Sequence, residues 1–175
     1  MKRILLEVWD AVEVSLITLI SILIIYKFIA HPFLVQGASM EPTFRHDNYL
    51  LVDEISYRFT EPERGEIVVF RSPKDRSVFY IKRIIGLPHD TVVITPEGVT
   101  VNGEPVEEGE YLPQGTVTRN YVESEFILGD RQYFVMGDNR DASYDSRSWG
   151  PITRADIIGK VRVRLWPITG RLLPR

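Results

Sequence analysis

Ser39 is the residue of this chain whose surroundings most directly suggest chemistry. It lies in the stretch GASMEP, between small residues on one side and Met40 and a proline on the other. A serine hydroxyl becomes a nucleophile at neutral pH only when a nearby base takes its proton. The chain must therefore supply that base.

Lys82 is the stronger candidate for the base. It lies within the apolar run SVFYIKRII at 77–85. In a strand alternate side chains share a face, so Lys82 would lie among apolar neighbours on a strand buried on both faces. Loss of hydration lowers the pKa of a lysine, and a neutral amine can take a proton from serine. A lysine that merely reaches solvent from an edge strand is the alternative.

The three histidines give weaker signals. His31, His46 and His89 lie in polar or turn-like surroundings typical of solvated surface side chains, and none has a metal-binding spacing such as HExxH. A Ser-His-Asp triad stays open as an alternative, because its members can be distant in sequence.

The loop GDNRDASYDSRSWGP at 137–151 interleaves acidic and basic side chains. It could be a solvated polar loop or a calcium loop, although its arginines interrupt the ligand pattern of the latter. It could also be a self-paired scaffold in which arginines bind carboxylates and Ser143 or Ser146 orients a catalytic group.

Short β-rich runs separated by turn signals would position these residues. The expected strands are 66–70, 77–85, 91–94, 99–101, 132–136 and 157–166, with turns at 96–98 and 102–103 and a helical turn near 154–158. The acidic segment 104–124 is expected to be an exposed excursion. These patterns predict a mostly β, compact antiparallel domain over residues 31–175.

Residues 11–30 form a largely apolar run interrupted only by Glu13 and Lys27. This predicts a single N-terminal transmembrane helix that follows a short cytoplasmic segment at 1–10. A cleavable signal peptide and an amphipathic or buried helix are the alternatives.

Composition narrows the function classes. The 175-residue chain has a net charge of -3, which argues against a nucleic-acid-binding protein. It has no cysteine, which excludes disulfides and thiolate chemistry.

Taken in order, the motifs GASMEPTF, GEIVVF, YIKRIIGLPHD and GDNRDASYDSRSWG resemble those of type I signal peptidases. These are membrane-bound serine proteases with a Ser/Lys dyad, and the resemblance covers nearly the whole chain. It implies that Ser39 is the nucleophile and Lys82 the general base. It also implies that Ser143 orients the lysine amine, while Asp145 and Arg147 pair to support the site.

The same resemblance implies an oxyanion site at Gly37, Ala38 and Ser39, and substrate contacts from Met40, Tyr80 and Ile81. Two positions depart from the family pattern. His89 replaces a frequent glycine in the GLPHD turn, and Gly37 replaces a serine found in some members. Without that serine, backbone N–H groups, Ser39's own included, would bind the oxyanion.

The expected function is removal of N-terminal signal peptides from secreted preproteins, with cleavage after Ala-x-Ala-like sites and without a cofactor or metal. The implied partners are preproteins and the lipid bilayer, with the catalytic domain on the extracytoplasmic side of the cell membrane. The alternatives are a dedicated maturation peptidase, a self-cleaving transcriptional regulator and a non-catalytic, membrane-anchored β-module that binds peptides.

Overall fold

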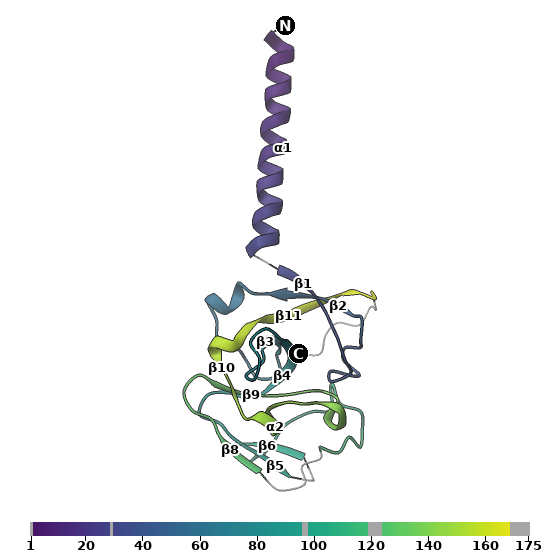
Figure 1. Ribbon diagram of the computed structural model, residues 1–175, viewed down its shortest axis with the longest axis vertical. Coiled ribbons are helices and arrows are strands. Elements are labelled where there is room, and N and C mark those ends of the chain that lie inside the picture. The colour runs from purple at the N-terminus through teal and green to yellow at the C-terminus, as the bar shows by residue number, and fades with distance from the viewer. Residues whose placement is uncertain (1, 29, 96–97, 119–123, 169–175) are drawn as a thin grey trace.

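The computed structural model describes residues 2–28, 30–95, 98–118 and 124–168, and within the N-terminal helix it describes the side chains of 7–22. The helix α1 (Lys2–Phe28) extends away from a β-rich body that contains the other described residues (Figure 1). Strand β1 (Ala30–Leu34) follows at the base of the helix.

The helix α1 differs from its prediction in two respects. It begins at Lys2 rather than at residue 11, so it also takes in Glu7 and Asp10. In the part of the chain that the structure describes, no helix is both long and apolar enough to cross a membrane. The transmembrane anchor predicted over 11–30 is therefore not supported, and neither is the single-pass topology built on it.

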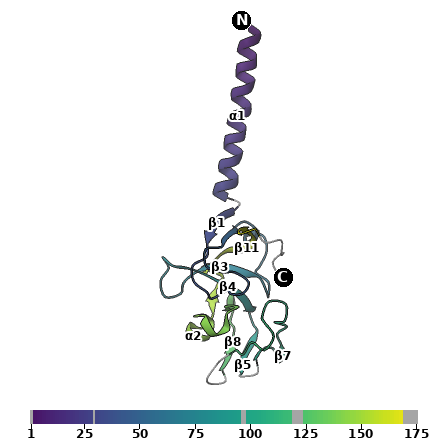
Figure 2. The ribbon, with the colours of Figure 1, turned by 90° about the vertical axis from the view of Figure 1, so that its right-hand side faces the viewer.

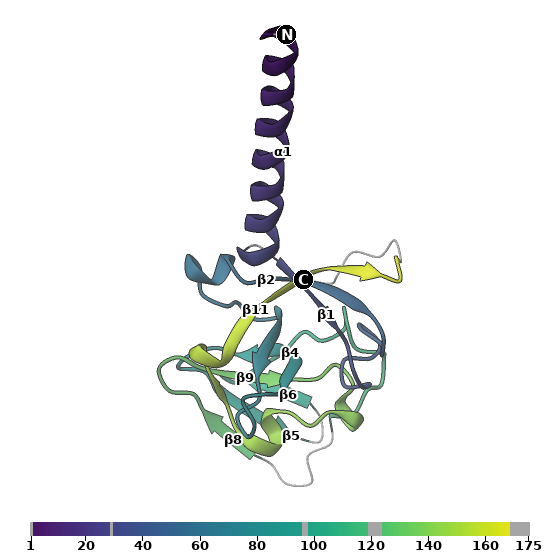
Figure 3. The ribbon, with the colours of Figure 1, turned by 45° about the horizontal axis from the view of Figure 1, so that its top comes forward.

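The larger sheet has seven strands and holds most of the elements predicted around the chemistry. Its order is β1, β2 (Tyr49–Asp53), β11 (Ile157–Trp166), β3 (Ile67–Arg71), β4 (Phe79–Gly86), β9 (Gln132–Met136) and β10 (Ile152–Thr153). Among the described residues every pairing in it is antiparallel. Figure 3 shows β1, β2 and β11 together at the end nearest α1.

A smaller sheet forms the end of the body farthest from α1 (Figure 2). Its order is β7 (Glu104–Pro105), β6 (Gly98–Val101), β5 (Thr91–Thr95) and β8 (Ser124–Ile127). The helical elements of the body are short. They are α2 (Ser146–Trp149) and 3-10 turns at Ser56–Arg58, Arg140–Ala142 and Arg154–Asp156.

The prediction of a mostly β, antiparallel body is confirmed. The strands expected at 132–136 and 157–166 have those bounds, and the others begin or end within two residues of their predicted limits. Strands β1, β2, β7, β8 and β10 were not predicted. The predicted turn at 96–98 falls partly outside the described residues, as do residues 119–123 of the excursion. The described part of that excursion is mostly exposed, but Tyr111 and Thr118 are buried.

Three apolar clusters form the core, and the candidate residues lie where two of them meet. One cluster packs around Phe44, Leu50 and Val52, beneath the loop that carries Ser39. The second contains Val68 and Ile84, on the face of the large sheet that Lys82 shares. A third cluster joins the small sheet to β9. The site therefore rests on packed strands rather than on surface loops alone.

Candidate active site

Lys82 lies in β4 with its side chain turned into the protein. It pairs across the sheet with Val68 and shares its face with Tyr80 and Ile84, all members of, or packed against, the second apolar cluster. Its exposed fraction is 3%. Burial lowers the pKa of the amine to about 8, while the charges of Asp145 and Asp138 act in the opposite direction. A substantial fraction of Lys82 is therefore neutral near pH 8.

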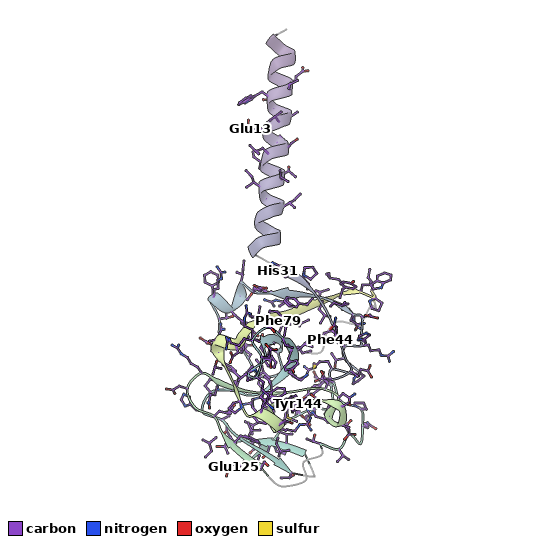
Figure 4. All side chains as sticks on the ribbon, in the orientation of Figure 1. Glu13, His31, Phe44, Phe79, Glu125 and Tyr144 are labelled. Carbon is purple, nitrogen blue, oxygen red and sulfur yellow. The ribbon has the colours of Figure 1, made fainter. Side chains whose placement is uncertain are left out.

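Ser39 lies in the loop between β1 and β2, and residues from far along the chain hold its backbone. The Asn139 N–H donates to the Ser39 carbonyl at 3.0 Å, and Asn139 Nδ2 donates to the Ala38 carbonyl at 3.1 Å. After the serine, the Phe44 N–H donates to the Met40 carbonyl at 2.8 Å. Phe44 is fully buried in the body of the domain (Figure 4). These contacts fix the loop and leave the Ser39 hydroxyl directed at β4.

The two predicted dyad residues are in direct contact. Lys82 Nζ donates to Ser39 Oγ at 2.6 Å and to the Ile81 carbonyl at 3.0 Å. A buried amine with a lowered pKa, within hydrogen-bond reach of a serine hydroxyl, has the geometry of a general base beside its nucleophile. The arrangement can transfer the serine proton to lysine without a histidine.

The histidines lie elsewhere. His46 Nδ1 accepts a hydrogen bond from the Gly37 N–H at 3.0 Å, so it supports the nucleophile loop. His31 pairs with Glu54, and His89 lies 3.3 Å from Asp130 on the surface. His89 also has a φ of 70°, in the left-handed region that glycine adopts most readily. This explains why glycine suits the position, and places His89 in the turn rather than at the dyad.

The loop after β9 is a self-paired scaffold. Arg147 binds Asp145 with Nε to Oδ1 and Nη2 to Oδ2, both at 2.8 Å, and the Asp145 side chain is fully buried. The Gly137 N–H donates to the same carboxylate at 3.0 Å. Arg147 also donates to the Arg140 carbonyl at 2.8 Å. The pair thus closes the loop on itself, as the motif led us to expect.

Ser143 makes no hydrogen bond to the Lys82 amine that it was predicted to orient. Its Oγ is buried and has no hydrogen-bond partner among the described residues. The amine instead uses the Ser39 hydroxyl and the Ile81 carbonyl. Ser143 does lie beside the site, because a Cβ added to Gly137 would lie 2.2 Å from Ser143 Oγ and 2.4 Å from the Ser39 carbonyl oxygen.

Arg83 and Asp138 are site residues that the sequence did not single out for this role. Arg83 follows Lys82 in β4, points to the opposite face, and binds Asp138 with two hydrogen bonds of 2.9 and 2.8 Å. The Thr43 hydroxyl donates to the same carboxylate at 2.5 Å. A charged residue at an inward position of an apolar strand was the available signal, because it requires a buried partner.

The residues predicted to contact the substrate differ in burial. Met40 is 1% exposed and packs in the core with Val35 and Phe44, because its side chain points inward as the loop turns. Its contact with a substrate stays a prediction. Tyr80 is half-buried and stacks on Trp149 with ring centroids 5.6 Å apart. Ile81 is half-buried against the first cluster.

The backbone groups expected to bind the oxyanion also differ in whether they are free to do so. The Gly37 N–H is occupied by His46, whereas the Ser39 N–H makes no hydrogen bond within the described part of the chain. Gly37 has a φ of 92°, which sets the turn that leads to the serine.

Comparisons with known proteins identify the family of the chain. The family model described as "Signal peptidase, peptidase S26" matches residues 8–166. A protein from Synechocystis named probable signal peptidase I-2 is 38% identical, over 91% of this chain and 74% of its own length. Signal peptidase IB from Staphylococcus aureus is 33% identical, over 97% and 93%. A crystal structure of a signal peptidase I from Enterococcus faecalis V583 matches with a TM-score of 0.48 and 26% identity, over 58% of this chain and 97% of that one.

Proposed function

Because the chain belongs to the signal peptidase family, peptidase S26, we propose that it removes signal peptides from preproteins with Ser39 as nucleophile and Lys82 as general base. The observation that carries the proposal is the 2.6 Å contact between Lys82 Nζ and Ser39 Oγ, made by an almost fully buried amine. A module that only binds peptides would have no need of a buried lysine beside a serine hydroxyl.

The neutral Lys82 amine takes the proton from Ser39 Oγ as that oxygen attacks the carbonyl carbon of the scissile peptide bond. The tetrahedral intermediate then collapses, and the lysine ammonium gives its proton to the departing nitrogen. This leaves the signal peptide as an ester on Ser39 and frees the mature chain. A water molecule then attacks the ester carbonyl while Lys82 takes one of its protons. The bond between the acyl carbon and Ser39 Oγ breaks, the lysine ammonium gives its proton to Ser39 Oγ, and the signal peptide leaves with a free carboxyl group.

The negative oxygen of the intermediate would be stabilised by the Ser39 N–H. Ser39 keeps its place because Asn139 holds its carbonyl, and Asn139 belongs to the loop that the Asp145–Arg147 pair closes. In this proposal the ion pair is a positioning element that never touches the substrate. Ser143, whose buried hydroxyl lies beside Gly137 and the Ser39 loop, is proposed to orient the lysine amine.

Cleavage after Ala-x-Ala-like sites is the proposed specificity. An extended substrate directs the residues one and three before the cut to the same side. Ile81, half-buried beside the dyad, is the residue proposed to limit the size of these side chains. Overfilling such a packed site costs about 1–3 kcal/mol, or roughly tenfold or more in rate per position.

Lipid is the proposed setting for this activity. The described part of α1 exposes large apolar side chains, including Trp9, Leu16 and Ile20. Exposed apolar surface of this extent marks a contact with lipid or protein. Co-sedimentation with phospholipid vesicles tests this proposal, with a Leu16→Ser/Ile20→Ser double variant that should bind less. Equal binding by both proteins would exclude α1 as the contact.

The test of the catalytic proposal is incubation with a preprotein, followed by mass spectrometry of the products. We expect one cut, after a small-x-small sequence, and a loss of at least about a thousandfold in rate for both Ser39→Ala and Lys82→Ala. The double variant should be no slower than either single one, because the two residues act as a unit. His89→Asn, at the exposed turn, is the control. Near wild-type cleavage by Lys82→Ala would disprove the mechanism.

Specificity needs its own substrate series, with leucine placed one, two or three residues before the cut. Cleavage should fall sharply for the first and third positions and persist for the second. Equal tolerance at all three would refute the proposed pockets while leaving the dyad untouched.

A further inference from the structure

A cleft of about 440 Å³ opens beside the nucleophile loop, and the proposed mechanism has not used it. One wall consists of Glu41 and Pro42. The loop at 138–141 forms its base, and the other wall comes from Pro113 and residues 115–117 of the excursion. Three segments that are distant in sequence therefore meet around it.

The cleft begins next to the reacting serine. Glu41 is two residues beyond Ser39 and donates its N–H to the Ala38 carbonyl at 3.1 Å. Asn139, in the base, binds the carbonyls of Ala38 and Ser39. A polypeptide whose scissile carbonyl sits at Ser39 Oγ needs space for residues on both sides of the cut, and this cleft borders the serine on the side that follows it in the chain.

The walls are fixed by buried ion pairs. Arg140 donates to both carboxylate oxygens of Glu108 and, at 2.8 Å, to Thr118 Oγ1, which fastens the excursion to the loop. Asp138 is bound by Arg83. The charges of Arg140 and Asp138 are thus compensated inside the protein, and neither determines which ligand charge the cleft accepts.

Glu41 differs from these residues. Its side chain is half-exposed, lines the cleft, and makes no ion pair or hydrogen bond among the described residues. Asp141 also lines the cleft, but the inference rests on the charge of Glu41. An uncompensated carboxylate attracts cationic groups and repels anionic ones over a few ångströms.

Apolar side chains lie shortly before Ser39 and Lys82 in the chain, in contrast to the charged lining of the cleft. Leu34 precedes Ser39 along the chain, Phe79 precedes Lys82, and both expose large apolar surfaces. These surfaces suit an apolar signal peptide, whereas the polar cleft suits the polar start of a mature protein. We propose that the cleft receives the first residues after the cut, and that Glu41 favours a basic over an acidic side chain there. This inference rests on the proposed function.

The experiment uses three matched peptide substrates that carry Lys, Gln or Glu at the second residue after the cut, and a second set varied at the third. The ratio of kcat/KM for the Lys and Glu peptides should be about three- to tenfold in the wild-type protein at low salt, the size expected for a partly exposed charge pair. It should approach one at high salt. Glu41→Gln should reduce the low-salt ratio, and Glu41→Lys should invert it.

The ratio does not depend on how much of a variant is folded, and the salt dependence tests the wild-type protein by itself. Glu125→Gln is the control of equal charge change, since Glu125 lies on β8 at the far end of the body (Figure 4), and it should keep the wild-type ratio. Cleavage of all peptides at equal rates would overturn the inference alone. Failure to cleave any of them would instead overturn the proposed function.

Discussion

Arg83 and Asp138 form an ion pair from which solvent is fully excluded, with both side chains 0% exposed. The pair connects the strand that carries Lys82 to the loop that holds Ser39, because Asp138 also accepts the Thr43 hydroxyl. The Tyr111 ring covers the guanidinium, 3.9 Å from ring centroid to Cζ. The alignment of the dyad thus depends on a contact that lies on the far side of β4 from the lysine.

Removing one member of this pair should be strongly destabilising. Arg83→Met and Asp138→Leu each leave a buried charge without its partner, which costs about 3–5 kcal/mol of unfolding free energy. The double variant should recover much of that stability, since an apolar pair of similar size is often tolerated. Its activity should stay low, because Thr43 has lost its anchor. Chemical denaturation and peptide cleavage measure the two effects.

Arg76→Met is the matched control. Arg76 binds Asp156 at 2.8 Å, but its side chain is 64% exposed, so its removal should cost less than about 1 kcal/mol. If the buried and exposed substitutions destabilised the protein equally, the structural importance given to Arg83 would be wrong.

The pH dependence of cleavage follows from Lys82. Its pKa in the folded protein is lowered to about 8, and in the proposed mechanism the neutral amine is the active form. Activity should therefore be full above that pKa and fall by about tenfold per pH unit well below it. Steady-state kcat/KM between pH 5.5 and 9.5 measures this limb. A flat profile over the range would contradict a lysine base.

Substitution of Arg147 should shift the pH range over which the activity falls. Its positive charge lowers the pKa of Lys82, so Arg147→Gln should raise this pKa and shift the limb to higher pH. Arg147→Lys keeps the charge, although it loses the paired geometry with Asp145, and should shift the limb less. A rate loss in both variants with no movement of the limb would show that Arg147 acts through structure alone.

Gly137→Ala should impair catalysis through crowding. The added Cβ would lie 2.4 Å from the Ser39 carbonyl oxygen and 2.2 Å from Ser143 Oγ, so the nucleophile loop must move. A displacement near 1 Å in an active site costs on the order of a hundredfold in rate. Gly109→Ala is the control, because its added Cβ meets nothing within 4 Å. Equal activity of both variants would show that the loop tolerates the shift.

Ser143→Ala should lower the cleavage rate without lowering the free energy of unfolding. The hydroxyl is buried without a partner, so its loss should leave the unfolding free energy equal or higher by about 1 kcal/mol. The rate should nevertheless fall, to about a tenth, if the hydroxyl orients the lysine amine. An unchanged rate would remove Ser143 from the mechanism. Ser146→Ala is the matched control, since Ser146 Oγ accepts the Val135 N–H at 3.0 Å and its loss should destabilise the fold.

Period-two patterns identified the strands that are buried on one or both faces, such as β4, β9 and β11. They missed β1 and β2, where a proline and an aspartate obscure the alternation, and α2, which spans a single turn fixed by the Asp145 cap. The N-terminal helix was predicted as an element but with a later start, because Glu7 and Asp10 lie outside the apolar run from which its bounds were predicted.

For the site, the motif order and the burial of a lysine in an apolar strand pointed to Ser39 and Lys82, and the structure brings these two together. Contacts between segments that are distant in sequence could not be predicted from motif order or from burial patterns. The Thr43–Asp138 link, the occupation of the Gly37 N–H by His46 and the inward turn of Met40 depend on how loops pack. Sequence spacing carries no information on such packing.

The link between Thr43 and Asp138 spans 95 positions of the chain, and it bears on how the cell makes this protein. During translation Ser39 and Lys82 leave the ribosome well before Asp138 and Asn139 do. The two proposed catalytic groups are therefore synthesised before the residues that fix the loop around Ser39. A chain released before Asp138 is made would carry both groups without the hydrogen bonds from Thr43 and Asn139 that hold this loop.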